Sequence, residues 1–250
     1  MSLLQVENVT KRFGNILAVD NVSLRVEAGE LRAVIGPNGA GKTTFFNLIS
    51  GFHKPDSGRI ILENHDVTDL LPTQRVWRGL ARTFQITEVF PRLTVRENIQ
   101  ISVEVASGFR LRMGLSRGER LEVQARVEEL LEWSRLARNA GRAVGELSHG
   151  DQRTVEIMMA LALNPRLLLL DEPTAGMGER ETYEVAQLIR RLHREKTLAI
   201  VLIEHDMRLV LRMADRVMVL DRGGVLADGA PAEIVADETV QAAYLGKAAA

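Results

Sequence analysis

The run GPNGAGKTT at residues 36–44 constrains the fold of this chain more than any other feature. It has the spacing Gly-x-x-x-x-Gly-Lys-Thr and stands between a strand-like segment, LRAVIG at 31–36, and a helix-like segment, TTFFNLISG at 43–51. A glycine-rich loop in this place turns its backbone N–H groups toward one centre, and the helix that follows adds the positive end of its dipole. The sequence therefore predicts a loop that binds phosphate groups.

Two residues of this loop have predicted chemical roles of their own. Lys42 supplies a point charge for the β- and γ-phosphates of a nucleotide, and Thr43 would hold Mg²⁺ through its hydroxyl. The chain has only five lysines, so a high lysine content does not explain the lysine inside the loop. An ordinary glycine-rich turn is the competing interpretation, and the strand-loop-helix context argues against it. The predicted nucleotide contacts are Gly36, Pro37, Asn38, Gly39, Ala40, Gly41, Lys42, Thr43 and Thr44.

A second candidate group follows the apolar run LLLL at 167–170, which ends in Asp-Glu-Pro. A buried strand that ends in aspartate places a carboxylate at the edge of a sheet, where it can bind Mg²⁺ through the metal's water ligands. Asp171 is therefore the predicted metal-side carboxylate. Glu172 is predicted to orient or deprotonate the water that attacks the terminal phosphate. Without the phosphate loop, the same residues would indicate no more than the end of a strand.

Two further residues are placed near this chemistry by the order of the segments. His205 ends the apolar run LAIVLIEH, so a parallel sheet would bring it to the same edge as Asp171. A plain surface histidine is the alternative, and the matching topology favours the catalytic role. Gln85, in RTFQITEVFP, stands where the chain leaves the core, so its amide is predicted to contact both the metal and whatever the next segment touches.

Composition limits the class of protein. The 250 residues are 46% hydrophobic and carry a formal charge of −1. This net charge produces no overall electrostatic attraction to nucleic acid or to an anionic membrane. No apolar run approaches the roughly 18 residues that span a bilayer. The chain has no cysteine, and its start lacks the charged-then-apolar layout of a signal peptide. The cytoplasm is the expected location, and no nucleic-acid partner is expected.

Hydrophobic periodicity predicts an α/β fold. Short strands at 3–9, 22–26 and 31–36 indicate an antiparallel group that leads into a buried strand, and the segment 58–64 returns as a strand. Residues from roughly 92 to 163 have helical periodicity. Within that stretch, a helix over 120–137 is predicted to bury one face formed by Leu121, Val127, Leu130, Leu131 and Trp133. Strands and helices then alternate from 167 to 221, which is typical of a mostly parallel sheet.

The segments GPNGAGKTT, RTFQ, LSHGD, LLLLDEP, AGMG and IEHD, in this order, resemble the ATP-binding cassette (ABC) family over essentially the whole chain. The resemblance implies a P-loop NTPase core with an antiparallel β subdomain and a helical subdomain insertion. It divides a single domain into a core at 1–85 and 165–250, a helical subdomain at 86–164 and a C-terminal helical tail at 231–250. It also implies that Phe13 stacks on adenine, although Phe13 as core filler is the competing interpretation.

In this family two cassettes bind head to tail, and the signature loop of one covers the γ-phosphate held by the other. Here that loop is 147–151, where Ser148 can donate a hydroxyl hydrogen bond and Gly150 allows close approach. His149 and Asp151 replace the usual glycine and glutamine. A Ser148–His149 nucleophile pair is rejected, because adjacent residues rarely orient into a working pair. A similar run at 114–120, GLSRGER, is expected to be a polar, basic loop between helices.

The resemblance implies ATP and Mg²⁺ as cofactors and a second ATPase subunit, identical or paralogous, as partner. It also implies transmembrane permease subunits, a periplasmic or extracellular solute-binding protein, and a place on the cytoplasmic face of the inner membrane. The ending VQAAYLG and other segments resemble importers of branched-chain amino acids or of urea and short amides. A lipopolysaccharide-export ATPase, a non-transport cassette and a monomeric kinase are the alternatives, and the last leaves LSHGD without a role. A surface around Gln85, Val89 and Phe90 is predicted to receive a permease helix.

Overall fold

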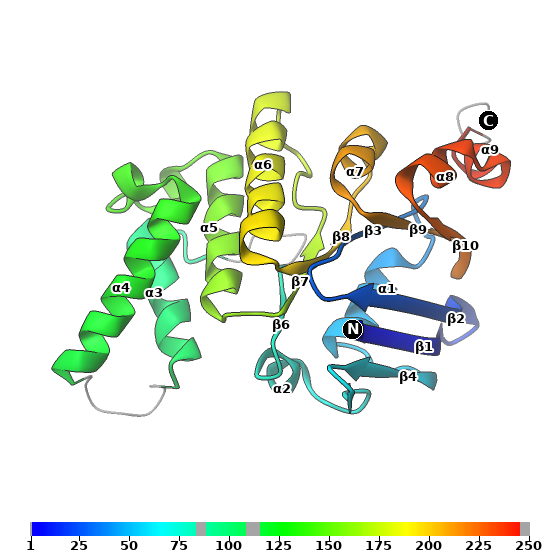
Figure 1. Ribbon diagram of the computed structural model, residues 1–250, viewed down its shortest axis with the longest axis horizontal. Helices are drawn as coiled ribbons and strands as arrows, with labels where there is room; N and C mark the ends of the chain where they lie inside the picture. The colour runs from blue at the N-terminus through cyan, green and yellow to red at the C-terminus, as the bar shows by residue number, and fades with distance from the viewer. Residues whose placement is uncertain (1, 84–88, 109–115, 246–250) are drawn as a thin grey trace.

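The computed structural model describes residues 2–83, 89–108 and 116–245 of the chain (Figure 1). Its first sheet is antiparallel and has the strand order β2-β1-β4-β5. Gly14 and Asn15 turn the chain between the first two strands, and Gly14 has a positive φ that suits this turn. The strands are β1 (Ser2–Phe13), β2 (Ile16–Glu27), β4 (Ser57–Leu62) and β5 (His65–Asp66).

The second sheet has the order β10-β9-β3-β8-β7-β6, and all its pairings are parallel except that of β10 with β9. Because β3, β7 and β8 run in the same direction, the loops that follow them leave the sheet at one edge. Those loops carry the predicted site residues. The strands are β3 (Leu31–Ile35), β6 (Leu80–Arg82), β7 (Leu167–Asp171), β8 (Ala199–Ile203), β9 (Arg216–Asp221) and β10 (Gly224–Gly229).

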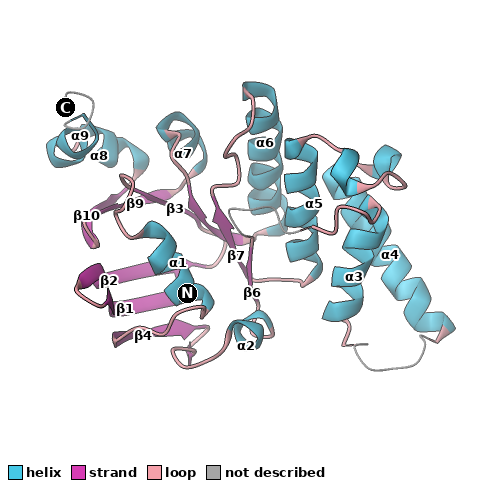
Figure 2. Cartoon of the chain, turned by 180° about the vertical axis from the view of Figure 1, so that it is seen from behind, coloured by secondary structure: helices cyan, strands magenta, loops and turns pink. Residues whose placement is uncertain are grey.

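Helices cover both faces of the parallel strands, and α1 lies between the two sheets (Figure 2). Helices α3, α4 and α5 form a layer beyond β6 and β7, as the predicted helical insertion requires (Figure 1). The helices are α1 (Lys42–Ser50), α2 (Pro72–Val76), α3 (Val95–Ala106), α4 (Arg117–Ser134), α5 (His149–Ala162), α6 (Glu179–Lys196), α7 (Met207–Met213), α8 (Pro231–Ala236) and α9 (Glu238–Leu245), with 3₁₀ turns at Ala137–Asn139 and Val144–Glu146.

Two hydrophobic clusters divide the core according to the faces of the second sheet. On β7, Leu168 and Leu170 belong to the cluster shared with the α5 and α6 side, whereas Leu167 and Leu169 belong to the cluster around α1. This alternation explains why the strand is apolar at every position, since both of its faces are buried. The continuous run LLLL is therefore a strand of a doubly covered sheet.

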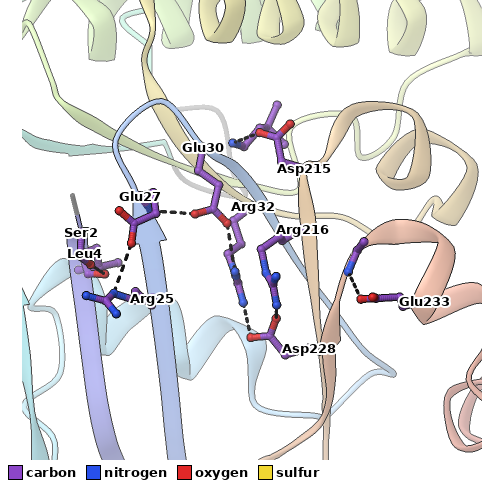
Figure 3. A network of polar contacts seen from close by, with 12 residues as sticks. Ser2, Leu4, Arg25, Glu27, Glu30, Arg32, Asp215, Arg216, Asp228 and Glu233 are labelled. Carbon is purple, nitrogen blue, oxygen red and sulfur yellow. Dashed lines mark hydrogen bonds and ion pairs between the residues drawn. The ribbon is translucent and has the colours of Figure 1, made fainter.

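A polar network fixes the beginning of β3, at the end of the strand away from the phosphate loop (Figure 3). Arg32 is buried and forms ion pairs with Glu30, at 3.1 Å, and with Asp228 of β10. Asp228 also pairs with Arg216 of β9 at 3.1 Å, so one carboxylate joins three strands. Satisfying these charges internally offsets part of the cost of burying an arginine.

The structure corrects the predicted buried face of the helix over 120–137. Leu121 is 60% exposed, and Val123 is buried in its place with Val127, Leu130 and Leu131. Two residues along an α-helix amount to roughly 200° of rotation, so Leu121 and Val123 lie on opposite faces. Trp133 packs against the core while only partly buried.

The structure also corrects the loop predicted for GLSRGER at 114–120, because residues 117–120 form the first turn of helix α4. Ser116 caps the N-terminus of α4 by accepting a hydrogen bond from the backbone N–H of Glu119 at 3.3 Å, and the Glu119 carboxylate accepts one from the N–H of Ser116 at 2.7 Å. Ser-x-x-Glu is therefore a capping box here.

Strands β6 and β10 were not predicted from the sequence. Strand β6 has only three residues, and β10 is a short run bounded by glycines, so neither shows enough periodicity to be recognised.

Candidate nucleotide-binding site

A cavity of about 410 Å³ brings together predicted residues from three separate parts of the chain. It contains most of the phosphate loop, the carboxylate that follows β7 and the histidine that follows β8. The start of β2 forms the opposite wall, which the sequence did not indicate. Its lining residues are Ile16, Leu17, Ala18, Asn38, Gly39, Ala40, Gly41, Lys42, Thr43, Thr44, Glu172 and His205.

The phosphate loop keeps its shape because a side chain would not fit at Gly41. This residue has φ +97°, and a Cβ there would overlap the carbonyl oxygen of Ala18 in β2. Gly41 is also the N-cap of α1, and its carbonyl accepts the first helical hydrogen bond from the N–H of Phe45 at 2.8 Å. The glycine thus lets the loop pass closely under β2 while starting the helix that points at the cavity.

Lys42 is held inside the loop. Its ammonium donates hydrogen bonds to the carbonyl oxygens of Gly36 at 2.8 Å and Pro37 at 3.0 Å, and the residue is buried. These bonds fix a positive charge beside the backbone of the loop. A triphosphate bound there would face this charge and the N-terminus of α1 together.

The predicted metal-side residues fit a magnesium ion that takes its other ligands from phosphate and water. Asp171 is buried, and its Oδ2 accepts a hydrogen bond from Nη2 of Arg82 at 2.8 Å. Its Oδ1 is buried with no hydrogen-bond partner in the described part of the chain. Thr43 is exposed at the first turn of α1 and lines the cavity. Mg²⁺ prefers this kind of hard oxygen donor and keeps several waters.

Burial raises the pKa of Asp171, and the neighbouring positive charge of Arg82 opposes this effect. Among the described residues, no group of three or more His, Cys, Asp or Glu side chains forms a metal cage. A site with one protein carboxylate is what Mg²⁺ uses when substrate phosphates supply the remaining ligands.

Glu172 and His205 meet at the mouth of the cavity. The Oε1 of Glu172 lies 2.6 Å from Nε2 of His205. Glu172 has φ +45°, a sparsely populated region for a residue with a side chain, and its N–H donates to the carbonyl of Ile203 at 3.0 Å. The backbone of the neighbouring strand therefore holds Glu172 in place, and its carboxylate lies beside the imidazole of His205.

Glu204 is a residue that the sequence analysis missed. It is buried, and its Oε1 accepts hydrogen bonds from the backbone N–H and the hydroxyl of Thr174, at 3.1 and 2.7 Å. Its Oε2 accepts one from the backbone N–H of His205 at 3.1 Å. Glu204 thus ties the loop after β7 to the loop after β8. The one available signal was a charged residue inside a predicted buried strand end.

The signature loop lies outside this cavity. Ser148 caps α5 and accepts a hydrogen bond from the N–H of Asp151 at 3.2 Å, and neither Ser148 nor Gly150 belongs to the lining. The N–H of Gly150 donates to Oε1 of Glu181 at 3.3 Å, which shows that this amide faces an anionic group. The α5 helix is also anchored to the site, because Nη2 of Arg153 donates to the carbonyl of Asp171 at 2.6 Å.

The structure does not bring the predicted adenine contact, Phe13, into the cavity. Phe13 is 43% exposed, and its ring packs edge-on against His53 with centroids 5.2 Å apart. Phe13 does not line the cavity, whereas Ile16, three residues further along, does. Gln85 lies outside the described residues.

Comparison with known proteins gives two family matches. Residues 19–175 match the model of the ABC transporter family, and residues 225–250 match that of the branched-chain amino acid ATP-binding cassette transporter. The high-affinity branched-chain amino acid transport ATP-binding protein LivG of Escherichia coli (strain K12) is 41% identical over 253 residues, with 98% of each chain covered. The lipopolysaccharide export system ATP-binding protein LptB of Haemophilus influenzae is 35% identical, covering 99% of this chain and 98% of its own.

Solved structures agree with the fold. The ADP conformation of MJ1267, an ATP-binding cassette of an ABC transporter, has a TM-score of 0.84 and 32% identity, with 98% of this chain and 99% of that chain covered. A dimeric post-hydrolysis state of the cassette MJ0796 bound to ADP and phosphate has a TM-score of 0.76 and 30% identity, covering 91% and 98%.

Proposed function

Because the chain belongs to the ABC transporter family of ATPases, we propose that it is the ATP-binding subunit of an importer of branched-chain amino acids. One observation carries the mechanism. The phosphate loop, Glu172 and His205 line one cavity, while Ser148 and Gly150 lie outside it. A complete nucleotide site therefore needs the signature loop of a second ATPase subunit. The similar dimeric cassette supports this arrangement.

In the proposed site, the backbone of the phosphate loop and Lys42 hold the phosphates of ATP. Thr43 and Asp171 would hold Mg²⁺, which supplies charge neutralisation at the β- and γ-phosphates. Glu172 accepts the proton of the attacking water, and His205 fixes the orientation of that carboxylate. Gln85 adds an amide to the metal side, and Phe13 or the apolar start of β2 covers the adenine.

The binding energy of ATP at the interface between the two subunits is sufficient to close the dimer. Moving an equilibrium from 1:99 to 99:1 needs about 5.5 kcal/mol of differential binding, which two nucleotides would share. Hydrogen bonds from Ser148 and the α5 N-terminus to a charged phosphate are each of order 1.5–3 kcal/mol. ATP therefore serves as the clamp between subunits, and its hydrolysis releases them.

We propose that permease subunits are driven by this closing and opening of the ATPase dimer. Among the described residues, no helix is long and apolar enough to cross a membrane. Phe90 is 48% exposed, and Asn98 fixes its backbone through two hydrogen bonds of 2.8 and 3.0 Å. An exposed ring on a rigid backbone suits contact with a permease helix. This assembly places the chain on the cytoplasmic face of the membrane, with a solute-binding protein on the other side.

The choice of solute rests on the similarity to LivG and on the C-terminal family match. The lipopolysaccharide-export relative has lower identity, and the urea and amide alternative has no better support. The test is to purify the native complex, reconstitute it in liposomes, and measure ATP-dependent uptake of leucine, isoleucine and valine against urea. Uptake of urea without uptake of branched-chain amino acids would refute the proposed solute class.

A further inference from the structure

Arg82, the last residue of β6, joins the two halves of the proposed metal site. Its side chain is only 6% exposed. Nη2 donates to Oδ2 of Asp171 at 2.8 Å, while Nη1 donates to Oδ1 of Asn47 at 2.7 Å and to the hydroxyl of Ser50 at 2.8 Å. One guanidinium therefore connects the end of β7 to helix α1.

The partners on α1 share a face with the proposed metal ligand of that helix. Thr43, Asn47 and Ser50 are spaced at i, i+4 and i+7, so they form one stripe along α1. Thr43 begins this stripe at the cavity, and Arg82 holds its two later members. The position of Arg82 against Asn47 and Ser50 therefore fixes how α1, and with it Thr43, sits relative to Asp171.

Aromatic rings restrict the guanidinium further. Its Cζ lies 5.8 Å from the ring centroid of Phe46 and 5.7 Å from that of Phe52. A planar group with these hydrogen bonds and ring contacts has little freedom to rotate. Asp171 is held a second time through its carbonyl, which accepts from Arg153 at 2.6 Å. Its carboxylate is therefore fixed with Oδ2 on Arg82 and with Oδ1, which has no partner among the described residues, left for another ligand.

We propose that Arg82 is a positioning residue for Mg²⁺, which sets the spacing between Asp171 and Thr43 by bracing β7 against α1. This inference rests on the metal-side role proposed for Asp171. Groups that orient metal ligands typically change metal affinity about 10–100-fold when they are replaced. Lysine would keep the positive charge but has one nitrogen where arginine uses two, Nη1 for Asn47 and Ser50 and Nη2 for Asp171. Arg82→Lys therefore tests geometry rather than charge.

Arg75 supplies a matched control. It is fully buried, and its guanidinium also holds α1, by donating to the carbonyls of Leu48 and Ile49 at 2.7 Å each. Its other hydrogen bonds go to the carbonyls of Thr68 and Leu70, and within the described part of the chain none of its hydrogen bonds goes to a carboxylate. Arg75→Lys therefore loosens the same helix at its C-terminal end without touching Asp171.

The experiment measures Mn²⁺ binding by electron paramagnetic resonance, with the full chain and the non-hydrolysable analogue AMP-PNP. Arg82→Lys is expected to weaken Mn²⁺ binding about tenfold, while the affinity for AMP-PNP in EDTA changes less than about twofold. Asn47→Ala, which removes one arm on the α1 side, should weaken Mn²⁺ binding in the same direction. Arg75→Lys should lower the urea midpoint of unfolding and leave Mn²⁺ affinity unchanged.

Two outcomes overturn the proposal: Mn²⁺ affinity equal to wild type in both Arg82→Lys and Asn47→Ala, or an equal loss in Arg75→Lys, which would indicate a general effect of stability. Asp171→Asn separates this failure from that of the proposed function. If Asp171→Asn binds Mn²⁺ as wild type does, then the metal-side role of Asp171 is wrong. If it loses Mn²⁺ while Arg82→Lys and Asn47→Ala keep it, then only the role of Arg82 is wrong.

Discussion

Oε1 of Glu172 and Nε2 of His205 lie 2.6 Å apart, although 33 positions separate the two residues in the sequence. Both follow strands of the same sheet, since Glu172 comes directly after β7 and His205 comes two residues after the end of β8. The backbone N–H of Glu172 donates to the carbonyl of Ile203, and that of His205 donates to the buried Glu204. The register of two parallel strands therefore builds the contact between the proposed base and its partner.

Replacing His205 is expected to slow ATP hydrolysis more than it weakens ATP binding. His205→Ala removes the group that orients Glu172, so the hydrolysis rate should fall by about 100-fold. ATP affinity in the absence of turnover should stay close to wild type. Steady-state phosphate release and equilibrium binding check the two parts, with the exposed His65→Ala as control. A full hydrolysis rate in His205→Ala would remove this residue from the mechanism.

Replacing Glu204 is expected to destabilise the fold. Glu204→Gln puts an amide where the carboxylate accepts hydrogen bonds from Thr174 and His205, so N–H groups would then face N–H donors. Leaving such buried groups unsatisfied costs about 1–3 kcal/mol. Urea unfolding should show this loss, whereas Glu122→Gln on the exposed surface of α4 should not. Equal unfolding free energies in the two variants would contradict the bridging role.

The raised pKa of Asp151 leads us to expect a pH-dependent change in the stability of the fold. Burial, followed by the charges of Glu184 and Glu181, raises its pKa above the ordinary value. The folded chain then holds this proton more tightly than the unfolded chain, so the contribution to stability is present at low pH and is lost as pH rises through the folded pKa. Asp151→Asn should therefore raise the unfolding midpoint at pH 7. The gain should vanish below about pH 3.9, where the carboxyl is protonated in both states.

Asp237 is expected to change the pH dependence of stability in the opposite direction, so it serves as the control for Asp151. The hydroxyl of Thr239 is the largest cause that lowers the pKa of Asp237. Its contribution is present above the unfolded pKa and is lost as pH falls through the folded one. Asp237→Asn should therefore lower the midpoint at pH 7. The same direction of change in both variants would contradict these assignments.

Phe90 tests the proposed permease contact. Phe90→Glu puts a charge on an exposed ring position outside the nucleotide cavity, so solute uptake by the reconstituted complex should be lost while basal ATP hydrolysis is kept. Leu121→Glu, at an exposed position of α4, should leave both activities unchanged. Normal uptake in Phe90→Glu would show that this surface is not the coupling contact.

The phosphate loop could be predicted because its chemistry is contiguous in the sequence. Gly41, Lys42 and Thr43 need only the strand before them and the helix after them, and both are apparent from periodicity. Asp171 and His205 were located in a similar way, since the ends of parallel strands meet at one edge of a sheet. Topology therefore carried the inference from local segments to one edge of the sheet, where Glu172 and His205 line the same cavity.

The buried polar contacts around that cavity could not be predicted in the same way. Arg82 bonds to Asp171 across 89 positions, and Glu204 bonds to Thr174 across 30. Arg82 and Glu204 stand in the segments RTFQ and IEHD, but these were interpreted through Gln85 and His205. A charged residue at the end of a short strand is normally expected to face solvent. Leu121 was misplaced for a different reason, because helical periodicity alone did not identify which residues of α4 face the core.

A crystal structure of the Glu172→Gln variant with ATP and Mg²⁺ tests the central claim most directly. Without a carboxylate to accept the proton of water, ATP should persist and hold two subunits together. We predict that the γ-phosphate lies within hydrogen-bonding distance of Lys42 from one protomer and of Ser148 and the N–H of Gly150 from the other. A γ-phosphate that is contacted by residues of a single protomer, in an ordered dimer, would contradict the account.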